Sequence, residues 1–276
     1  MIRAASAPPR SSGIERKSAR ELEIMRQAGR IVAVTLAELR AYARLGATTR
    51  QLDALAEKII RQHKAQPAFK GYPGPYPFPA STCISVNEEL VHGIPGKRVL
   101  KEGDLVSIDC WVRYQGYYGD SAISFVIGRV SPEAENLLAA TEGALYAAID
   151  MLRPGKRTGD VAAAIQTHVE RRGFNVVRQY TSHGIGREMH EAPFIHNYGK
   201  AGTGPSLRPG MTIALEPMTL AGKPETRVLA DQWTVASKDG KLTAHFEHTV
   251  AVTEGEPEIL TGLSSADKTT KNPLIR

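Results

Sequence analysis

The sequence contains little of what several classes of protein require. Only two cysteines, Cys83 and Cys110, occur in 276 residues, too few for a disulfide framework or a cysteine-based zinc site. No apolar run approaches the ~20 residues of a membrane-spanning helix. The first residues also contain no apolar stretch of signal-peptide length. We therefore expect a protein of a reducing compartment, the cytoplasm or an organelle, with no membrane segment.

The net charge of the chain is concentrated at its two ends. The formal net charge is +6, of which residues 1–20 contribute +4 and residues 264–276 contribute +2. The body therefore carries no net charge, which argues against a basic nucleic-acid-binding domain. We expect a disordered basic tail over residues 1–17, a single catalytic domain over residues 18–263 and a C-terminal tail over residues 264–276. A weak contact of the tails with RNA is the alternative to simple solvation.

Hydrophobic spacing predicts four helices, each with a cap at its start. The first follows a capping box formed by Ser18 and Glu21 and runs to about residue 44. Short apolar stretches predict strands, and the proline-rich residues 71–79 predict a loop. The expected caps of the other helices are Thr48 or Thr49, Ser131 and Thr158.

The second half of the chain resembles the first. Residues 46–60 resemble residues 155–169, and the strand that ends in Asp109 resembles the strand that ends in Glu216. Each half thus contains two helices, a histidine segment and a strand that carries a carboxylate. Chance similarity between amphipathic helices is the alternative. A pseudo-twofold fold would bring Asp109 and Glu216 together near its axis.

Two carboxylates, Asp109 and Asp120, lie eleven positions apart in residues with strand character. Gln115 and Gly116 between them are typical of a turn. In an antiparallel hairpin the two aspartates can lie opposite each other, with Cβ atoms ~4.5–5.5 Å apart. Such carboxylates repel each other unless they are protonated or bridged by a cation. Taken alone, the stretch also suits two ordinary turn or edge aspartates.

Three further side chains, His183, Glu216 and Glu247, are candidates to join this pair. Four carboxylates and one imidazole form a hard-to-borderline ligand set that suits two divalent ions such as Mn, Fe, Co or Zn. Two ions ~3.5–4 Å apart activate a shared water and polarise a carbonyl, which is metal-assisted hydrolysis. Singly, each residue has a plainer interpretation, because a lone histidine is usually a core residue and Glu247 could pair with His248.

At these residues the chain resembles the type I methionine aminopeptidases, metallopeptidases of the pita-bread fold. The resemblance covers about residues 18–262, and an ordered set of eight motifs makes it specific. The motifs are Val91-His92-Gly93-Ile94-Pro95, Ser107-Ile108-Asp109, Gly119-Asp120-Ser121, His183-Gly184-Ile185-Gly186, Met189-His190-Glu191-Ala192-Pro193, Leu215-Glu216-Pro217-Met218, Asp231-Gln232-Trp233-Thr234-Val235 and Phe246-Glu247-His248-Thr249-Val250.

The resemblance implies a fold and an activity. The fold would be of the α/β (α+β) pita-bread type, a curved antiparallel sheet with a pseudo-twofold internal repeat and helices on the outside. The activity would be removal of the N-terminal methionine from nascent proteins and peptides with a small second residue, through a metal-bridging hydroxide. The implied protein is a monomer with two divalent ions (Co, Fe, Mn or Zn). The basic tails suggest, from their charge, a weak contact with the ribosome.

The resemblance also implies a role for each candidate residue. The metal ligands would be Asp109, Asp120, His183, Glu216 and Glu247, with Asp120 and Glu247 bridging the ions. The catalytic residues would be His92, His190 and Glu216, and the two histidines would also touch the substrate peptide. An apolar pocket for the methionine side chain, which suits an unbranched thioether, would contain Tyr72, Cys83 and Trp233.

The chain departs from the family at the pocket. The loop of residues 71–79 is longer and richer in proline than in short bacterial forms, so Tyr72, Tyr76 and Phe78 all remain candidates to line the pocket. Met189 stands where many members carry an aromatic residue. The short interval between Glu216 and Glu247 leaves no room for the helical insert of type II enzymes, and two cysteines exclude a zinc-finger extension.

Two other functions on the same fold remain as alternatives. A proline-directed peptidase, an aminopeptidase P or prolidase, would share the five ligands but carry a large N-terminal domain, whereas only about 17 residues precede the first helix here. A non-catalytic module that binds peptides or histones would have lost metal ligands, whereas all five are present in this chain.

Overall fold

The computed structural model describes residues 13–263, so most of the predicted N-terminal tail and the predicted C-terminal tail lie outside the described residues. Within this range it contains four helices: α1 (Ala19–Tyr42), α2 (Thr49–Gln62), α3 (Pro132–Ile149) and α4 (Thr158–Glu170). The strands are β1 (Gln66–Pro67), β2 (Thr82–Val86), β3 (Glu89–Val91), β4 (Leu105–Tyr114), β5 (Tyr117–Val126), β6 (Asn175–Val176), β7 (Thr181–Gly184), β8 (Glu191–His196), β9 (Thr212–Leu215), β10 (Met218–Leu220), β11 (Thr226–Val228), β12 (Val235–Ser237), β13 (Thr243–His245), β14 (His248–Ala251) and β15 (Glu258–Ile259).

The helix starts follow the capping signals in all but one case. The box of Ser18 is present before α1, Thr48 caps α2, and the third helix begins at its predicted proline. The prediction of Thr158 as the fourth cap is wrong by one residue, because Arg157 is the cap of α4. The side chain of Asp160 accepts a hydrogen bond of 2.8 Å from the Arg157 backbone N–H. This bond satisfies one of the free donors of the first turn, so the helix begins at Thr158.

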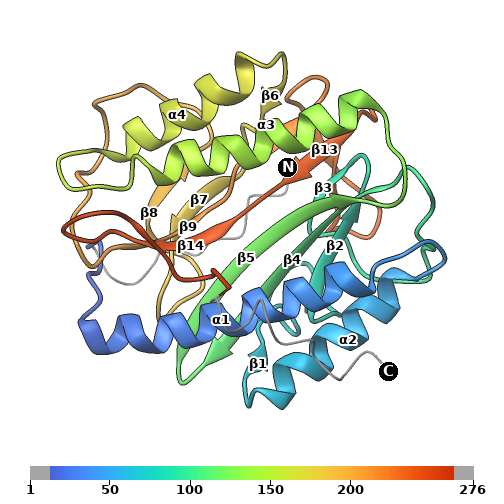
Figure 1. Cartoon of the computed structure of the whole chain (residues 1–276), viewed down its shortest axis with the longest axis horizontal. Coiled ribbons are helices and arrows are strands. Elements are labelled where there is room, and N and C mark those ends of the chain that lie inside the picture. Colours follow the sequence, from blue (N-terminus) through green and yellow to red (C-terminus); the bar gives the residue numbers. More distant parts are fainter. Residues whose placement is uncertain (1–12, 264–276) are drawn as a thin grey trace.

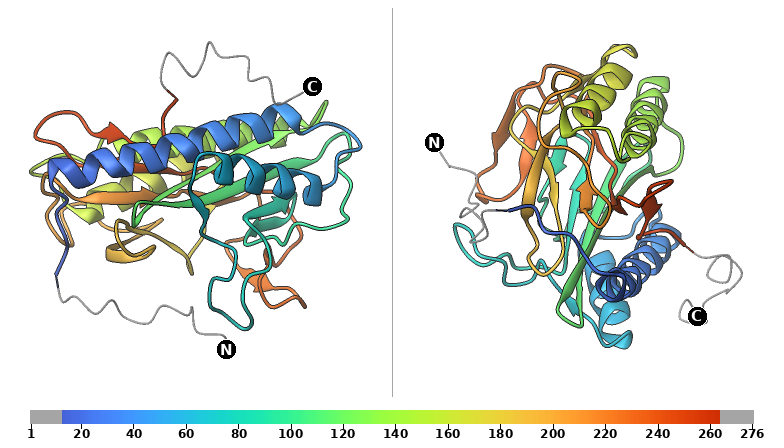
Figure 2. Two further views of the ribbon diagram at one scale, coloured as in Figure 1. Left: turned by 90° about the horizontal axis from the view of Figure 1, so that it is seen from below. Right: turned by 90° about the vertical axis from the view of Figure 1, so that its left-hand side faces the viewer.

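The strands form one layer, and the four helices cover one side of it (Figures 1 and 2). Helices α1 and α2 pack with β2, β4 and β5 around one apolar core, and α3 and α4 pack with β9 and β14 around another. Each half of the chain therefore has a helix pair of its own over strands of its own. Helices α2 and α4 begin at the two threonines that the repeat aligned, Thr49 and Thr158.

The two halves meet through β5 and β14. The Glu247 N–H donates to the Ala122 carbonyl at 2.9 Å. The Thr249 hydroxyl accepts from the Asp120 N–H at 3.1 Å and donates to the Asp120 carbonyl at 2.8 Å. These bonds join the halves beside two of the predicted ligands, Asp120 and Glu247.

The predicted aspartate hairpin exists, but its register differs from the prediction. Gln115 and Gly116 form a two-residue turn with φ of 48° and 88°, which is the arrangement that favours a tight hairpin. Asp109 consequently pairs with Ala122 and not with Asp120. The prediction that the aspartates lie directly opposite each other is therefore wrong by two positions. A shift of two keeps both side chains on the same face of the sheet, as diagonal neighbours.

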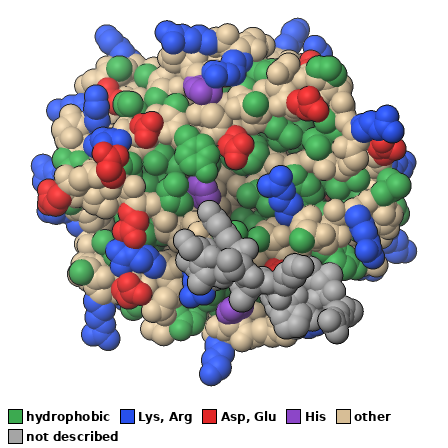
Figure 3. All heavy atoms as spheres, in the orientation of Figure 1, with side chains coloured by type: hydrophobic (Ala, Val, Ile, Leu, Met, Phe, Trp, Pro, Cys, Tyr) green, Lys and Arg blue, Asp and Glu red, His purple; other side chains and the backbone are tan. Residues whose placement is uncertain are grey.

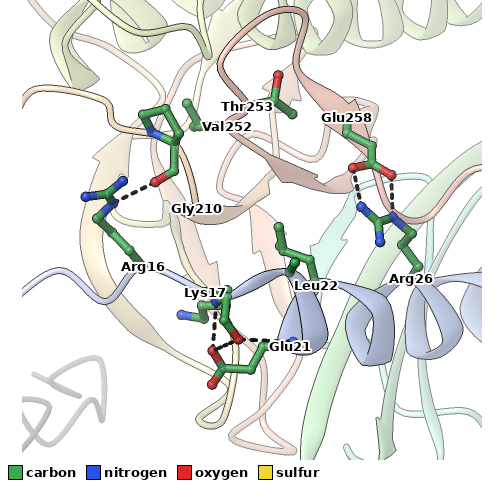
Figure 4. A pocket seen from close by; sticks show the side chains of 12 residues that line it. Arg16, Lys17, Glu21, Leu22, Arg26, Gly210, Val252, Thr253 and Glu258 are labelled. Atoms are coloured by element: carbon green, nitrogen blue, oxygen red, sulfur yellow. Dashed lines mark hydrogen bonds and ion pairs between the residues drawn. The ribbon is translucent and has the colours of Figure 1, made fainter.

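Residues 13–17, which the sequence placed in the disordered tail, lie against the second half of the protein. The Lys17 N–H donates to the Gly210 carbonyl at 2.6 Å. The Lys17 ammonium forms an ion pair with Glu191, in which both side chains are buried. Arg16 and Lys17 line a surface hollow of about 530 Å³, and Figure 4 shows the side chains around it. The packed part of the chain thus begins before the predicted boundary at residue 18.

The distribution of charged side chains on the surface agrees with the absence of net charge outside the two tails. Figure 3 shows basic and acidic side chains scattered over the visible face, with no large area of one sign. Among residues 13–263, no helix combines the length and the apolar character that crossing a bilayer requires.

Candidate metal centre

The structure brings the five predicted metal ligands together where the two halves meet. One ligand atom each from Asp120, His183 and Glu247 lie within 4.8 Å of one another. His183 Nε2 lies 3.9 Å from Asp120 Oδ2 and 3.5 Å from Glu216 Oε1. Asp109 is close enough for its charge to raise the pKa values of Asp120, Glu216 and Glu247.

The carboxylates are buried without enough partners. Asp109 Oδ1, both oxygens of Asp120 and Glu247 Oε1 are buried and have no hydrogen-bond partner among the described residues. Burial raises the pKa of Asp109 to about 8. Burial, followed by the charges of Glu247, Asp109 and Glu216, raises the pKa of Asp120 well above its usual value. Divalent cations would supply both the missing partners and the compensating charge, so the residues present fit a metal site.

The two ring nitrogens of His183 have different surroundings. Its Nδ1 lies 2.9 Å from the Gly184 carbonyl oxygen. Burial lowers its pKa to about 4, so the ring is neutral near pH 7 and the Nδ1–H donates to that carbonyl. The lone pair of Nε2 therefore faces Asp120 and Glu216. In histidines that bind metals, a hydrogen bond from the other ring nitrogen usually fixes the tautomer in this way.

His190 lies next to His183 and contacts the predicted pocket. The centroids of the two imidazole rings are 4.4 Å apart. His190 Nδ1 lies 3.0 Å from the Tyr72 hydroxyl. Burial, and then the neighbouring His183, lower the pKa of His190 to about 3. A neutral imidazole thus sits between the carboxylates and the aromatic side chains.

His92 is held by a tight piece of backbone. Its φ of 59° is in the left-handed region, which costs a non-glycine residue free energy and persists where the surrounding structure holds it. The following residue must be glycine, because a Cβ on Gly93 would lie 2.3 Å from the Ile84 carbonyl oxygen. Burial, and then His190, lower the pKa of His92 to about 4, and its ring centroid lies 6.4 Å from that of Trp233.

Of the three residues predicted to form the pocket, Cys83 lies in a buried apolar cluster, and Tyr72 and Trp233 pack against that cluster. The three aromatic candidates of the loop have different surroundings. Tyr72 contacts His190, and Phe78 is fully buried. Tyr76 is exposed, and its hydroxyl donates to the Asp231 carbonyl. The cluster also contains Phe69, Trp111 and Met189, of which the sequence singled out only Met189.

One histidine near the carboxylates was not predicted. His245 is buried, and its Nε2 lies 3.8 Å from Glu216 Oε2 and 3.9 Å from Glu247 Oε2. Burial, and then His92, lower its pKa to about 3. The two-residue spacing of His245 and Glu247 was the available signal, since alternate positions of an extended chain share a face.

Comparison with known proteins identifies relatives of the chain. A model of metallopeptidase family M24 matches residues 23–254. Methionine aminopeptidase 1 of Bacillus subtilis is 51% identical over 245 residues, which cover 89% of this chain and 98% of the relative. The solved structure of methionine aminopeptidase from Thermotoga maritima is 47% identical, with a TM-score of 0.88, and the match covers 90% of this chain and 99% of that one.

A more distant likeness helps to weigh the alternatives. Prolidase from Pyrococcus furiosus is 22% identical with a TM-score of 0.73, and the match covers 66% of that chain. This likeness shows the fold alone, which confirms the predicted pita-bread fold. The proline-directed alternative thus has only the fold in its favour.

Proposed function

The chain belongs to metallopeptidase family M24, among its methionine aminopeptidases, and from this premise we propose that it removes the N-terminal methionine from peptides and nascent proteins by metal-dependent hydrolysis. The observation that carries the proposal is the convergence of one imidazole and four carboxylates, three of which have buried oxygens without partners among the described residues. These residues are Asp109, Asp120, His183, Glu216 and Glu247.

We infer that these residues would hold two divalent ions, and that Asp120 and Glu247 would be the ligands shared by both. This placement is supported by the number of buried carboxylates, because one divalent ion would leave part of their charge uncompensated. Divalent ions polarise a carbonyl and lower the pKa of water when they are bound at such a centre. The donor set of oxygens and one nitrogen suits Mn, Fe, Co or Zn.

Glu216 is the carboxylate best placed to carry a proton. Its side chain is 14% exposed, compared with 2% for those of Asp120 and Glu247. Burial, followed by the charges of Glu247 and Asp109, raises its pKa well above the usual value. A group with a raised pKa that water can reach is suited to take a proton and return it to the leaving amine.

His190 and His92 would bind the peptide. If the Tyr72 hydroxyl donates to His190 Nδ1, the proton of the neutral ring is on Nε2, which becomes a donor for the oxygen of the scissile carbonyl. Such a donor gains strength as negative charge develops on that oxygen. His92, held by its left-handed backbone, would orient the peptide from the side of Trp233.

The apolar cluster next to His190 supports the choice of methionine. Burial raises the pKa of Cys83 well above the usual value for a thiol, so its sulfur is an uncharged part of the wall. Tyr72 and Trp233 pack against the same cluster and add aromatic surface to it. Thioethers make favourable contacts with aromatic rings, whereas a charged first residue would lose hydration without a partner.

The test uses protein stripped of metal with a chelator. We expect no release of methionine from Met-Gly and Met-Pro peptides until Mn, Fe, Co or Zn is added back singly, and no cleavage of Gly-Pro. His183→Ala and Asp109→Asn should lose metal and turnover together. Full turnover of the stripped protein, or of either variant at low metal, would overturn the assignment. The monomeric state, the cytoplasmic location and a ribosome contact through the tails stay predictions.

A further inference from the structure

His245 carries a buried ring nitrogen that the proposed function does not use. Its side chain is 2% exposed, and Nε2 has no hydrogen-bond partner among the described residues. A buried donor or acceptor without a partner costs ~1–3 kcal/mol, so such groups are rare in native proteins outside functional sites. The nitrogen faces two carboxylates of the candidate metal centre, Glu216 and Glu247.

The backbone of His245 is fixed on both sides. The Ser124 hydroxyl donates to the His245 carbonyl at 2.7 Å and accepts from the His245 N–H at 3.0 Å. Strand pairing places His245 opposite Met218, two residues after Glu216. The imidazole is therefore presented to the carboxylates by two neighbouring strands and is not a mobile side chain that turns toward them by chance.

The carboxylate of Glu216 lies between two imidazoles. His183 Nε2 is 3.5 Å from Oε1, and His245 Nε2 is 3.8 Å from Oε2. The lone pair of His183 Nε2 faces the site, as its Nδ1 contact requires. The second distance exceeds the N–H···O range of 2.7–3.2 Å, and a movement of about 0.8 Å would bring the Glu216 oxygen to the usual ~3.0 Å.

We propose that His245 is a positioning residue of the metal centre, whose Nε2–H donates to Glu216 Oε2 and so keeps Oε1 directed at the metal on the His183 side. This inference rests on the proposed function for the role of Glu216. Carboxylates that bind metals are themselves usually held by such outer hydrogen bonds, and loss of one typically costs ~10–100-fold in metal affinity. Glu216 is the more exposed of the two carboxylates near His245, so it has the greater need for such a restraint.

The experiment compares His245→Gln with His245→Leu. Glutamine keeps an N–H donor of similar reach but is a poor metal ligand, whereas leucine keeps the volume and has no donor. We expect metal affinity, measured by competition with a chelator, to fall ~10–100-fold in the leucine variant and to stay within about threefold of the parent in the glutamine variant. The visible absorption spectrum of the Co(II)-loaded protein should change in the leucine variant only.

His168→Leu is the matched control. His168 also has a buried Nε2 without a partner among the described residues, but it lies on α4, away from the metal centre. Its replacement should change melting temperature without changing metal affinity or the Co(II) spectrum.

Two outcomes would overturn the inference. Equal loss of metal in both His245 variants would mean that the nitrogen binds metal directly, and unchanged affinity in both would mean that it only fills space. Failure of the proposed function appears differently. In that case the parent protein would release no methionine, while the affinity difference between the two variants would still report on His245.

Discussion

The two halves of the candidate metal centre are built in different ways. In the first half, Asp109 and Asp120 project from two long, uninterrupted strands, β4 and β5. In the second half, Glu216 follows the last residue of β9, and Glu247 lies between β13 and β14. Both halves therefore supply carboxylates to the candidate metal centre. The backbone that carries these carboxylates is a long strand in the first half and a strand end or a connection in the second.

The difference shows two ways of placing a ligand. The ladder of β4 and β5 sets the position of both aspartates mainly by backbone pairing, and the Thr249 hydroxyl adds two bonds to the Asp120 backbone. The second half relies on side chains, because the Ser182 hydroxyl accepts from the Glu216 N–H at 3.0 Å and the Asn197 side chain accepts from the Met218 N–H at 3.0 Å. We therefore expect substitutions of neighbouring side chains to disturb the second half more than the first.

The largest effects should come from two histidines that lie seven positions apart in the second half. His183→Ala removes a proposed ligand and should abolish metal binding and turnover together. His190→Ala should retain metal but lower kcat ~10²–10³-fold, the usual cost of removing a donor to a developing oxyanion. Metal stoichiometry and steady-state kinetics on both variants separate the two roles.

The melting temperature serves as the control for this pair. If His190 had only a structural role, its replacement would lower the melting temperature without a selective loss of kcat. Metal loss in His190→Ala equal to that in His183→Ala would contradict the assignment of only five ligands.

A smaller but clear effect is expected at the ion pair that holds the segment after His190. Lys17→Met leaves the buried Glu191 carboxylate without its cation, and breaking a buried pair typically costs ~3–5 kcal/mol. The backbone N–H groups of Arg187 and Glu188 still donate to Glu191, so we expect a value near the lower end. Urea denaturation of the metal-free protein measures it.

An exposed ion pair provides the comparison for Lys17. Arg61→Met breaks the pair with Glu57 on the surface of α2 and should leave the free energy of unfolding nearly unchanged. Equal effects of the two substitutions would show that Lys17 is not buried in solution. The double change Lys17→Met with Glu191→Met should recover part of the lost stability, because no buried charge then remains.

The sequence predicted most of this architecture, for identifiable reasons. The boxes at Ser18 and Thr48 mark helix starts because the same side chains supply the bonds of the first turn. Gln115 and Gly116 were identified as turn residues, but placing Asp109 opposite Asp120 requires a turn centred one residue earlier in the chain. The predicted partner of Asp109 was therefore wrong by two positions. A turn signal therefore fixes the register only when its two central residues are identified.

The side chains missed by sequence reasoning lack a distinctive local pattern. His245 is one apolar-flanked histidine in a short strand, and only the arrangement of β10 and β13 brings it to Glu216. Phe69 stacks on Trp111 with ring centroids 3.9 Å apart, although the two residues are far apart in sequence. Both contacts depend on tertiary packing, and the two-residue spacing of His245 and Glu247 was the one local signal for either of them.

Removing one buried hydroxyl from each half tests whether metal binding depends more on neighbouring side chains in the second half than in the first. Ser182→Ala removes the acceptor of the Glu216 N–H and should weaken metal binding about tenfold, at the lower end of the outer-contact range. Thr82→Val removes the hydroxyl bond to Asp53 beside the first-half strand and should lower stability by ~1–3 kcal/mol without weakening metal binding. Chelator competition measures the metal affinity of both variants, and urea denaturation measures their free energy of unfolding. Equal metal loss in the two would remove the distinction between the halves.

The smallest effect should follow removal of residues 1–12, which precede the segment that holds the second half. The five predicted ligands all lie beyond residue 108, and the contacts of Lys17 with Gly210 and Glu191 remain in the shortened protein. Turnover of small peptides should therefore stay within about twofold of the parent, because the deletion removes none of these groups. Removal of residues 1–17 is the sharper companion, since it also deletes Lys17 and should lower stability as Lys17→Met does. Kinetics with Met-Gly peptides and urea denaturation of both shortened proteins test the pair. A collapse of turnover on removing residues 1–12 alone would mean that this segment takes part in substrate binding, and the boundary between tail and catalytic domain would then move toward the N-terminus.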